Sequence, residues 1–295
     1  MNNSPLNRIK SSQELDKLDI IRNKRKRLIQ SNTIRRICRG TYAPTDLSLT
    51  LEEKHLANAL GVKNRTASLV LCNTSAAIAW GIALLNQPRR VHIRGTKGSR
   101  TPDVRVHQDT RTKTAPTAIT PDGFEATTPI ETVISCARFC PFLDAVVIAD
   151  SALFRRVVTY SELYTELYDV QGIGASKARK VADSMCENVM SPGETLLRLA
   201  LIEYGLSPIV QCPVQTATRT YHGDLGLPEQ YIIFEFDGKV KYSGAYGGPQ
   251  RVLLEEKQRM DDIVNAGWRV IRISWDMLRS DTRQLEYILK QNHLI

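Results

Sequence analysis

The sequence contains no run of about 18 apolar residues, the length that a helix needs to cross a bilayer, so we expect no membrane span. Its first residues are polar and lack the apolar stretch that a secretory signal requires. The six cysteines form no CxxC pair, and none has a histidine nearby at zinc-binding spacing. We therefore expect reduced thiols in a cytoplasmic protein.

Positive charge is concentrated at the start of the chain. The formal net charge is +9 over 295 residues, a length that suggests two domains. Residues 1–45 contain eleven Lys and Arg against three Asp and Glu, whereas residues 151–295 contain seventeen against eighteen. A localised basic surface attracts a phosphate backbone, although a solvated basic arm would have the same composition. We expect DNA as the partner, with RNA as the alternative.

The basic region has the outline of a winged helix-turn-helix. We expect a disordered tail over residues 1–12, helices up to residue 30, and a short basic strand that ends at Gly40. The run of residues 22–27 is either the start of a recognition helix or a solvated charge run. We predict a winged-helix-like DNA-binding module over residues 13–45. Its nucleic-acid-binding candidates are Arg22, Lys24, Arg25, Lys26, Arg27, Arg35, Arg36 and Arg39.

The middle region, residues 46–186, is predicted to be an α+β domain without a concentration of catalytic residue types. Near its end, Gly172-Ile173-Gly174 stands between two helical stretches. This pattern is typical of a helix-hairpin-helix, which binds phosphate through backbone N–H groups. We favour the alternative, an ordinary connector with a glycine turn, because the sequence contains one short copy of the pattern.

Residues 187–295 predict the element order α-β-β-β-α-β, a mixed sheet flanked by helices. Ser191, Pro192 and Glu194 match a helix cap, which accounts for Glu194 without any catalytic role. In the strand 231–239, Glu235 and Asp237 share one face, within an apolar run. Carboxylates in such surroundings need a cation, which can be a lysine, an arginine or a metal.

Asp224 precedes Glu235 by a spacing that suits an adjacent strand, so it can reach the same cluster. Oxygen ligands suit Mg²⁺ (or Mn²⁺), so we predict a metal site at Asp224 and Glu235, with a structural ion-pair network as the alternative. Lys239 and Lys241 follow, close enough to orient water or neutralise a phosphate. Glu256 falls on the core-facing stripe of the next helix, where it is either part of the site or paired with Arg259.

The C-terminal third resembles a domain of unknown function related to very-short-patch-repair endonucleases, within the PD-(D/E)XK nuclease superfamily. The resemblance is carried by residues 191–198, 224, 235–238, 256–259 and 267–275. It implies a restriction-endonuclease-like fold, with Glu194 as the helix acid and Asp224 and Glu235 as metal ligands. Asp237 stands where that pattern expects a lysine, so the match assigns no general base.

The front of the chain resembles the AbiEi family of antitoxins, on Arg39-Gly40-Thr41-Tyr42, Ser75-Ala76-Ala77 and Thr128-Pro129 with Glu131-Thr132-Val133. The resemblance implies DNA binding and a cognate toxin as partner, and it leaves self-association open. Two functions follow as hypotheses. One is a Mg²⁺-dependent endodeoxyribonuclease that uses Glu194, Asp224, Glu235, Asp237, Lys239, Lys241 and Glu256. The other is a non-catalytic, antitoxin-like regulator with a degenerate nuclease fold.

Overall fold

The computed structural model describes residues 4–66, 69–95, 101–108, 115–238, 249–280 and 282–295. The chain divides into two compact units, Met1–Asp183 and Ser184–Ile295, and each is described by itself. Both units combine helices with sheet, which confirms the expected mixed α and β class. In the part of the chain that the structure describes, no helix is long and apolar enough to span a bilayer.

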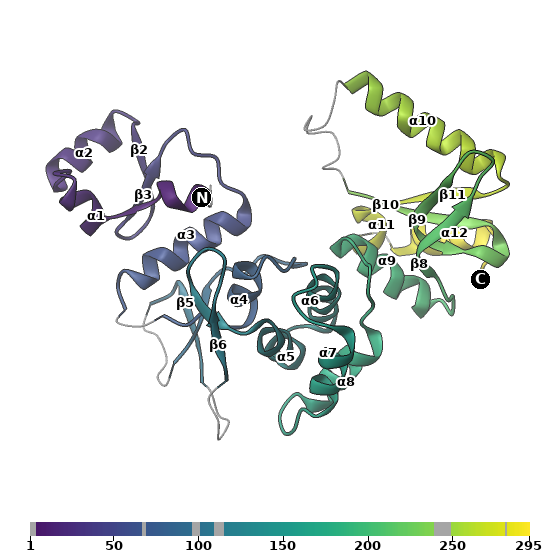
Figure 1. The fold of residues 1–295 in the computed structure, drawn as a ribbon, viewed down its shortest axis with the longest axis horizontal. Helices are drawn as coiled ribbons and strands as arrows, with labels where there is room; N and C mark the ends of the chain where they lie inside the picture. Colours follow the sequence, from purple (N-terminus) through teal and green to yellow (C-terminus); the bar gives the residue numbers. More distant parts are fainter. Residues whose placement is uncertain (1–3, 67–68, 96–100, 109–114, 239–248, 281) are drawn as a thin grey trace. The chain divides into compact units, whose positions relative to one another are not determined.

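The first unit opens with two short helices and a three-stranded sheet (Figure 1). Its elements are η1 Pro5–Arg8, β1 Lys10–Ser11, α1 Ser12–Lys17, α2 Arg22–Gln30, β2 Ile34–Cys38 and β3 Thr41–Pro44. The sheet order is β1-β3-β2, with both pairs antiparallel, and the two helices connect the first strand to the second. The winged-helix-like module that the sequence predicts stays a prediction, and α2 is the second helix of this arrangement.

The prediction of a disordered tail over residues 1–12 was wrong for the residues that the structure describes. Leu6 and Ile9 are 7% and 5% exposed, and they belong to the hydrophobic core of the first unit. At the start of α1, the Ser11 hydroxyl accepts from the Glu14 amide while the Glu14 carboxylate accepts from the Ser11 amide. Two apolar side chains and one capping box therefore hold this polar segment in place.

A second sheet follows in the middle of the chain. Its elements are α3 Leu51–Lys63, α4 Asn73–Ala79, β4 Val91–Arg94, β5 Val104–His107, β6 Thr117–Ile119 and β7 Glu125–Thr127. Strands β4 and β5 are parallel, and Leu71 bridges β4 to β7. Because β4 and β5 run in the same direction, their last residues, Arg94 and His107, are register partners at one edge of the sheet.

Four helices complete the first unit: α5 Pro129–Phe139, α6 Phe142–Phe154, α7 Tyr160–Tyr168 and α8 Ala175–Ser184. Between α7 and α8, Gly172 and Gly174 have φ values of 73° and 83°, as a tight hairpin requires. Ile173 at the hairpin is 81% exposed, whereas Leu167 and Val181 on the flanking helices are buried. The structure thus shows two helices joined by a tight glycine turn, and both the phosphate-binding motif and the ordinary connector stay open.

The second unit has the predicted element order. It comprises α9 Pro192–Glu203, β8 Ile209–Gln215, β9 Thr220–Leu227, η2 Pro228–Gln230, β10 Ile232–Asp237, α10 Pro249–Asn265, β11 Arg269–Ser274, α11 Trp275–Arg279 and α12 Thr282–Gln291. The sheet order is β11-β10-β9-β8, with only the β10–β11 pair parallel. This confirms the expected mixed sheet. One of its faces packs on α9 and α12, and the other packs on Ile263 of α10.

Candidate functional site

Strand β10 presents different chemistry on its two faces, as its alternation predicts. Ile232, Phe234 and Phe236 lie in the core on the α9 side. Ile233 lies in the smaller core on the α10 side. Glu235 shares that second side, and its side chain is only 12% exposed. The strand therefore places one carboxylate in a largely dry environment beneath α10.

Two arginines neutralise Glu235. The Arg259 Nη1 atom of α10 lies 2.7 Å from Glu235 Oε1. The Arg272 Nε atom of β11 lies 3.8 Å from Glu235 Oε2. Arg272 Nη2 also lies 3.0 Å from Glu256 Oε1, so two arginines and two glutamates form one network. Arg259 is further fixed by donating from Nη2 to the His222 carbonyl at 3.1 Å.

The other predicted acids have separate structural tasks. Asp224 Oδ2 accepts the Phe236 amide of the neighbouring strand at 2.8 Å. Glu194 is 6% exposed, and its carboxylate accepts from the Met190 amide at 2.9 Å and from the Ser191 hydroxyl at 2.8 Å. Ser191 is the predicted cap, since its hydroxyl also accepts the Glu194 amide at 3.2 Å, but the Glu194 carboxylate accepts the Met190 amide where a capping box would use the Ser191 amide. These contacts hold Glu194 at the start of α9 by interactions that need no metal.

Glu256 differs from its expected position. The sequence placed it on the core-facing stripe of α10, but its side chain is 49% exposed. Residues 254–258 of α10 are all exposed, and among the described side chains of this helix Ile263 is the buried one. Asp237, at the end of β10, is also exposed. Lys239 and Lys241, which were predicted to orient water or neutralise a phosphate, lie outside the described residues.

A divalent cation at Asp224 and Glu235 stays a prediction. Both oxygens of Glu235 lie near guanidinium groups, and Oε1, although 2.7 Å from Arg259 Nη1, is a buried oxygen that accepts no hydrogen bond among the described residues. Within the residues that the structure describes, no three His, Cys, Asp or Glu side chains are grouped as metal ligands. What the network can do as it stands is to fix α10 and β11 against β10. This corresponds to the ion-pair alternative that the sequence left open.

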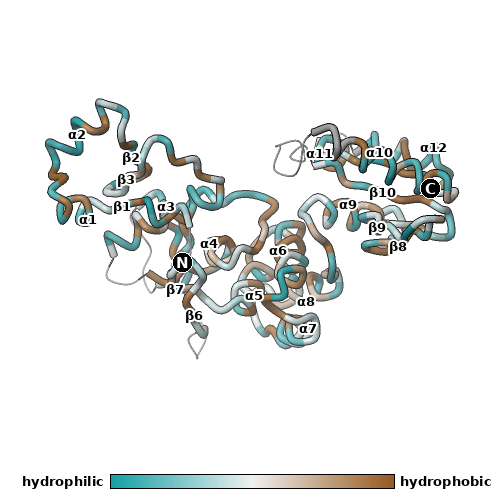
Figure 2. The backbone as a smooth tube through the Cα atoms, turned by 45° about the horizontal axis from the view of Figure 1, so that its top comes forward, coloured by the Kyte–Doolittle hydropathy of each residue, from teal (hydrophilic) through white to brown (hydrophobic). Residues whose placement is uncertain are grey.

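Helix α2 offers the basic surface that the sequence predicted. It has no buried residue, and its tube is mostly hydrophilic in Figure 2. Six of the eight predicted nucleic-acid-binding residues are exposed: Arg22, Lys24, Lys26, Arg27, Arg36 and Arg39. The last two belong to β2 and to its turn into β3. The exposed cations therefore lie on both the second helix and the hairpin of the predicted winged-helix-like module.

The remaining two, Arg25 and Arg35, are placed differently from expectation. Arg25 Nη1 lies 2.5 Å from Asp16 Oδ1 and also donates to the Ser12 and Ile20 carbonyls, each at 3.1 Å. Arg35 Nη2 donates to the Leu47 carbonyl at 2.6 Å. Both guanidinium groups turn inward because the main chain offers them carbonyls, so they position α2 and β2 instead of facing solvent.

Arg272 belongs to the network of two arginines and two glutamates, and the sequence did not predict this contact. Its signal is present in the strand pairing, because Arg272 is the register partner of Glu235 across the β10–β11 pair. Alternation alone placed Arg272 on a strand face. Only the parallel register shows that this face is the one that carries Glu235.

Two buried histidines give the first unit a pH dependence. Burial lowers the pKa of His55 to about 4 and that of His92 to about 3. Ser75 Oγ joins them, at 2.8 Å from both His55 Nε2 and the His92 amide. The folded-state pKa values lie below the unfolded value of about 6.5, so the neutral form stabilises the fold. That stability is complete above pH ~6.5 and is lost as the pH falls below it.

We expect the free energy of unfolding of the first unit to fall by roughly 3 kcal/mol on account of His55 between pH 7 and pH 4. Urea unfolding followed by circular dichroism measures it. His55→Gln should flatten the pH dependence, and the control His293→Gln, at an exposed histidine, should not. Equal acid losses in the wild type and in His55→Gln would contradict the assignment.

The comparisons with known proteins give little guidance. No family model and no curated protein matches the chain. One similar solved structure is the crystal structure of the RV2827C protein from Mycobacterium tuberculosis, at 19% identity. The similarity covers 70% of this chain and 78% of that chain, with a TM-score of 0.39. A likeness at that level carries no argument about function.

Proposed function

We propose that this protein binds duplex DNA through the exposed basic side of α2, and that its second unit is non-catalytic. The observation that carries the proposal is the placement of Arg22, Lys24, Lys26 and Arg27 on the second helix of the predicted winged-helix-like module. Phosphate contacts by Lys and Arg supply most non-specific DNA affinity. A helix in the major groove reads base edges.

The hairpin supports the same function. Arg36 and Arg39 are exposed on β2 and on the turn into β3, next in the chain after α2. Arg25 fixes α2 to the preceding segment through the Ser12 and Ile20 carbonyls. Its guanidinium carbon also lies 5.9 Å from the Tyr42 ring centroid. The helix, the hairpin and the inward-facing arginine thus act together. The AbiEi-like resemblance points in the same direction and adds a toxin as a candidate protein partner.

The second unit is proposed as a degenerate nuclease fold. Glu235 is the strongest candidate for a catalytic residue in this unit, and its carboxylate pairs with Arg259 and Arg272. Removing a partner from a largely buried ion pair leaves an uncompensated charge and costs several kcal/mol. Hydrolysis would require Glu235 to leave both arginines and Asp224 to leave the Phe236 amide. The network therefore favours a structural task over the Mg²⁺-dependent endonuclease that the resemblance implies.

A plasmid-nicking assay tests this part of the proposal. We expect supercoiled DNA to stay intact with the wild type in Mg²⁺ and in Mn²⁺, and equally with Glu235→Ala. The variant Glu286→Ala, at a partly exposed glutamate that pairs with Lys290 on α12, serves as the control for loss of one carboxylate. Nicking by the wild type that EDTA and Glu235→Ala both abolish, and that Glu286→Ala retains, would establish the endonuclease instead.

A further inference from the structure

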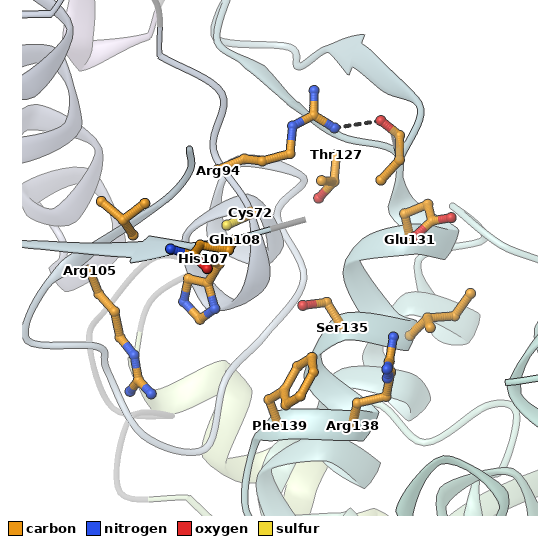
Figure 3. A pocket seen from close by; sticks show the side chains of 13 residues that line it. Cys72, Arg94, Arg105, His107, Gln108, Thr127, Glu131, Ser135, Arg138 and Phe139 are labelled. Carbon is orange, nitrogen blue, oxygen red and sulfur yellow. Dashed lines mark hydrogen bonds between the residues drawn. The ribbon is translucent and has the colours of Figure 1, made fainter. Parts of the chain in front are cut away.

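A cavity of about 420 Å³ opens in the first unit, where the parallel strands β4 and β5 end (Figure 3). Ligands of open α/β sheets bind beyond the carboxyl ends of parallel strands. The strand-end side supplies Arg94, His107 and Gln108. One face of α5 supplies the opposite wall, through Glu131, Ser135, Arg138 and Phe139. The volume is within the range of small-ligand sites.

The lining of this cavity is rich in cations. Among the lining residues that the structure describes, the charged ones are Arg94, Arg105 and Arg138 and one carboxylate, Glu131. Arg94 Nη1 donates to the Ala115 carbonyl at 2.5 Å. Among the described residues, neither Arg94 nor Arg105 has a carboxylate oxygen within 4.0 Å. Guanidinium groups gathered in a concave site are suited to an anion, above all a phosphate.

Hydrogen bonds from Asn73 and His92 hold two polar lining residues, Ser135 and His107, in place. Asn73 is 2% exposed, and its Nδ2 donates to Ser135 Oγ at 3.2 Å. Its Oδ1 lies 3.2 Å from His92 Nδ1, which in turn lies 3.2 Å from His107 Nε2. Because Ser135 accepts from Asn73, its own O–H is directed away from that bond. The hydroxyl can then donate to a ligand. Figure 3 shows Ser135 pointing into the open space.

An aromatic surface borders the same space. Phe139 is 53% exposed at the end of α5, although large apolar side chains elsewhere on this helix are buried. The Arg138 guanidinium carbon lies 5.0 Å from its ring centroid. Arg138 Nε donates to the Ile173 carbonyl at 2.8 Å, which fixes the stacked pair. A planar ring beside fixed donors is a platform for an aromatic base.

We propose that this cavity binds a nucleoside monophosphate. The phosphate would be held by Arg94, Arg105 and the Ser135 hydroxyl, and the base would stack on Phe139. Arg94 and Arg105 lie on the strand side of the cavity, whereas Ser135 and Phe139 lie on α5, so a ligand that carries both a phosphate and a base can contact both sides. The proposal does not rest on DNA binding by α2, which lies in a separate part of the first unit.

Isothermal titration calorimetry on the full chain tests the proposal with AMP, inorganic phosphate and adenosine as probes. We expect AMP to bind one site per chain, and both fragments to bind at least tenfold more weakly. Arg105→Gln, at an exposed position, should weaken AMP about tenfold, the loss of one charge-assisted hydrogen bond. Arg94→Gln should weaken it similarly, with circular dichroism as the check on folding. Phe139→Ala should weaken AMP and leave phosphate unchanged.

Two matched variants outside the cavity complete the experiment. Arg89→Gln and Phe154→Ala remove the same side-chain types from exposed positions, and both should bind AMP like the wild type. AMP that binds no better than adenosine, or that is unaffected by Arg105→Gln and Arg94→Gln, overturns the proposal. Binding of a single-stranded oligonucleotide without binding of AMP overturns it too, since the site would then take a nucleic-acid strand.

Discussion

Replacing Arg22, Lys24, Lys26 and Arg27 together by glutamine should lower the affinity for duplex DNA about a thousandfold at ~0.1 M salt. The figure follows from ~1 kcal/mol for each of four phosphate contacts, with 1.4 kcal/mol for each factor of ten. All four side chains are exposed, so the fold should be unaffected. Fluorescence anisotropy with a labelled duplex measures the affinity, and circular dichroism checks the fold.

A charge-matched control separates a binding surface from a general charge effect. Arg89, Arg90, Lys257 and Arg283 are also exposed, and they lie outside the winged-helix elements. Replacing these four by glutamine changes the net charge by the same amount. We expect the control to retain affinity within a few-fold. Similar losses in both variants would mean that DNA responds to net charge alone, and α2 would lose its assigned role.

Gly193→Ala should prevent stable folding of the second unit. A Cβ at position 193 would lie 2.1 Å from Cε1 of Phe236, far inside any van der Waals contact. The Phe236 ring cannot yield easily, because it is 7% exposed and its centroid lies 4.9 Å from that of Trp275, in an edge arrangement. Helix α9 would have to move away from β10. We expect a loss of roughly 3 kcal/mol or more in the free energy of unfolding, as for a severe case of overpacking.

A second glycine, Gly238, faces the same Phe236 ring and supplies the control for this substitution. A Cβ at Gly238 would meet Phe236 Cε1 at 3.6 Å, an ordinary contact, so Gly238→Ala should change stability by less than ~0.5 kcal/mol. Urea unfolding followed by tryptophan fluorescence reports the second unit through Trp268 and Trp275 when the wild type and both variants carry Trp80→Phe, which removes the signal of the first unit. Equal stability of Gly193→Ala and the wild type would show that α9 does not pack on β10 as described.

Much of the second unit could be predicted from the sequence, because local signals determine it. Alternation in β10 fixed which side chains face each core, and the Ser191–Glu194 pattern fixed the start of α9. The restriction-endonuclease relationship itself stays a prediction. The helices and hairpin of the predicted winged-helix-like module also followed from local signals, whereas the ordered segment before α1 did not. Leu6 and Ile9 are buried only because α3 and the following segments complete the core around them.

The pairing of charges could not be predicted, since it depends on register and on tertiary packing. Arg259 pairs with Glu235 because α10 packs on that face of the sheet. Arg272 pairs with Glu235 because β11 runs parallel to β10 and places the two residues in register. The cation-rich cavity was missed for the same reason. Arg94 and Arg105 come from strands that meet only through parallel pairing, and Ser135 comes from a later helix. Sequence spacing contains no information on such encounters.

The salt dependence of wild-type binding to a labelled duplex tests the central claim most directly. If α2 and the hairpin hold DNA by phosphate contacts, the logarithm of the association constant should fall linearly with the logarithm of the salt concentration. With at least four contacts the slope should be about −3.6 or steeper. The same titrations in Mg²⁺ should leave the duplex uncut. Absence of duplex binding at ~50 mM salt, or an affinity independent of salt, would contradict the account.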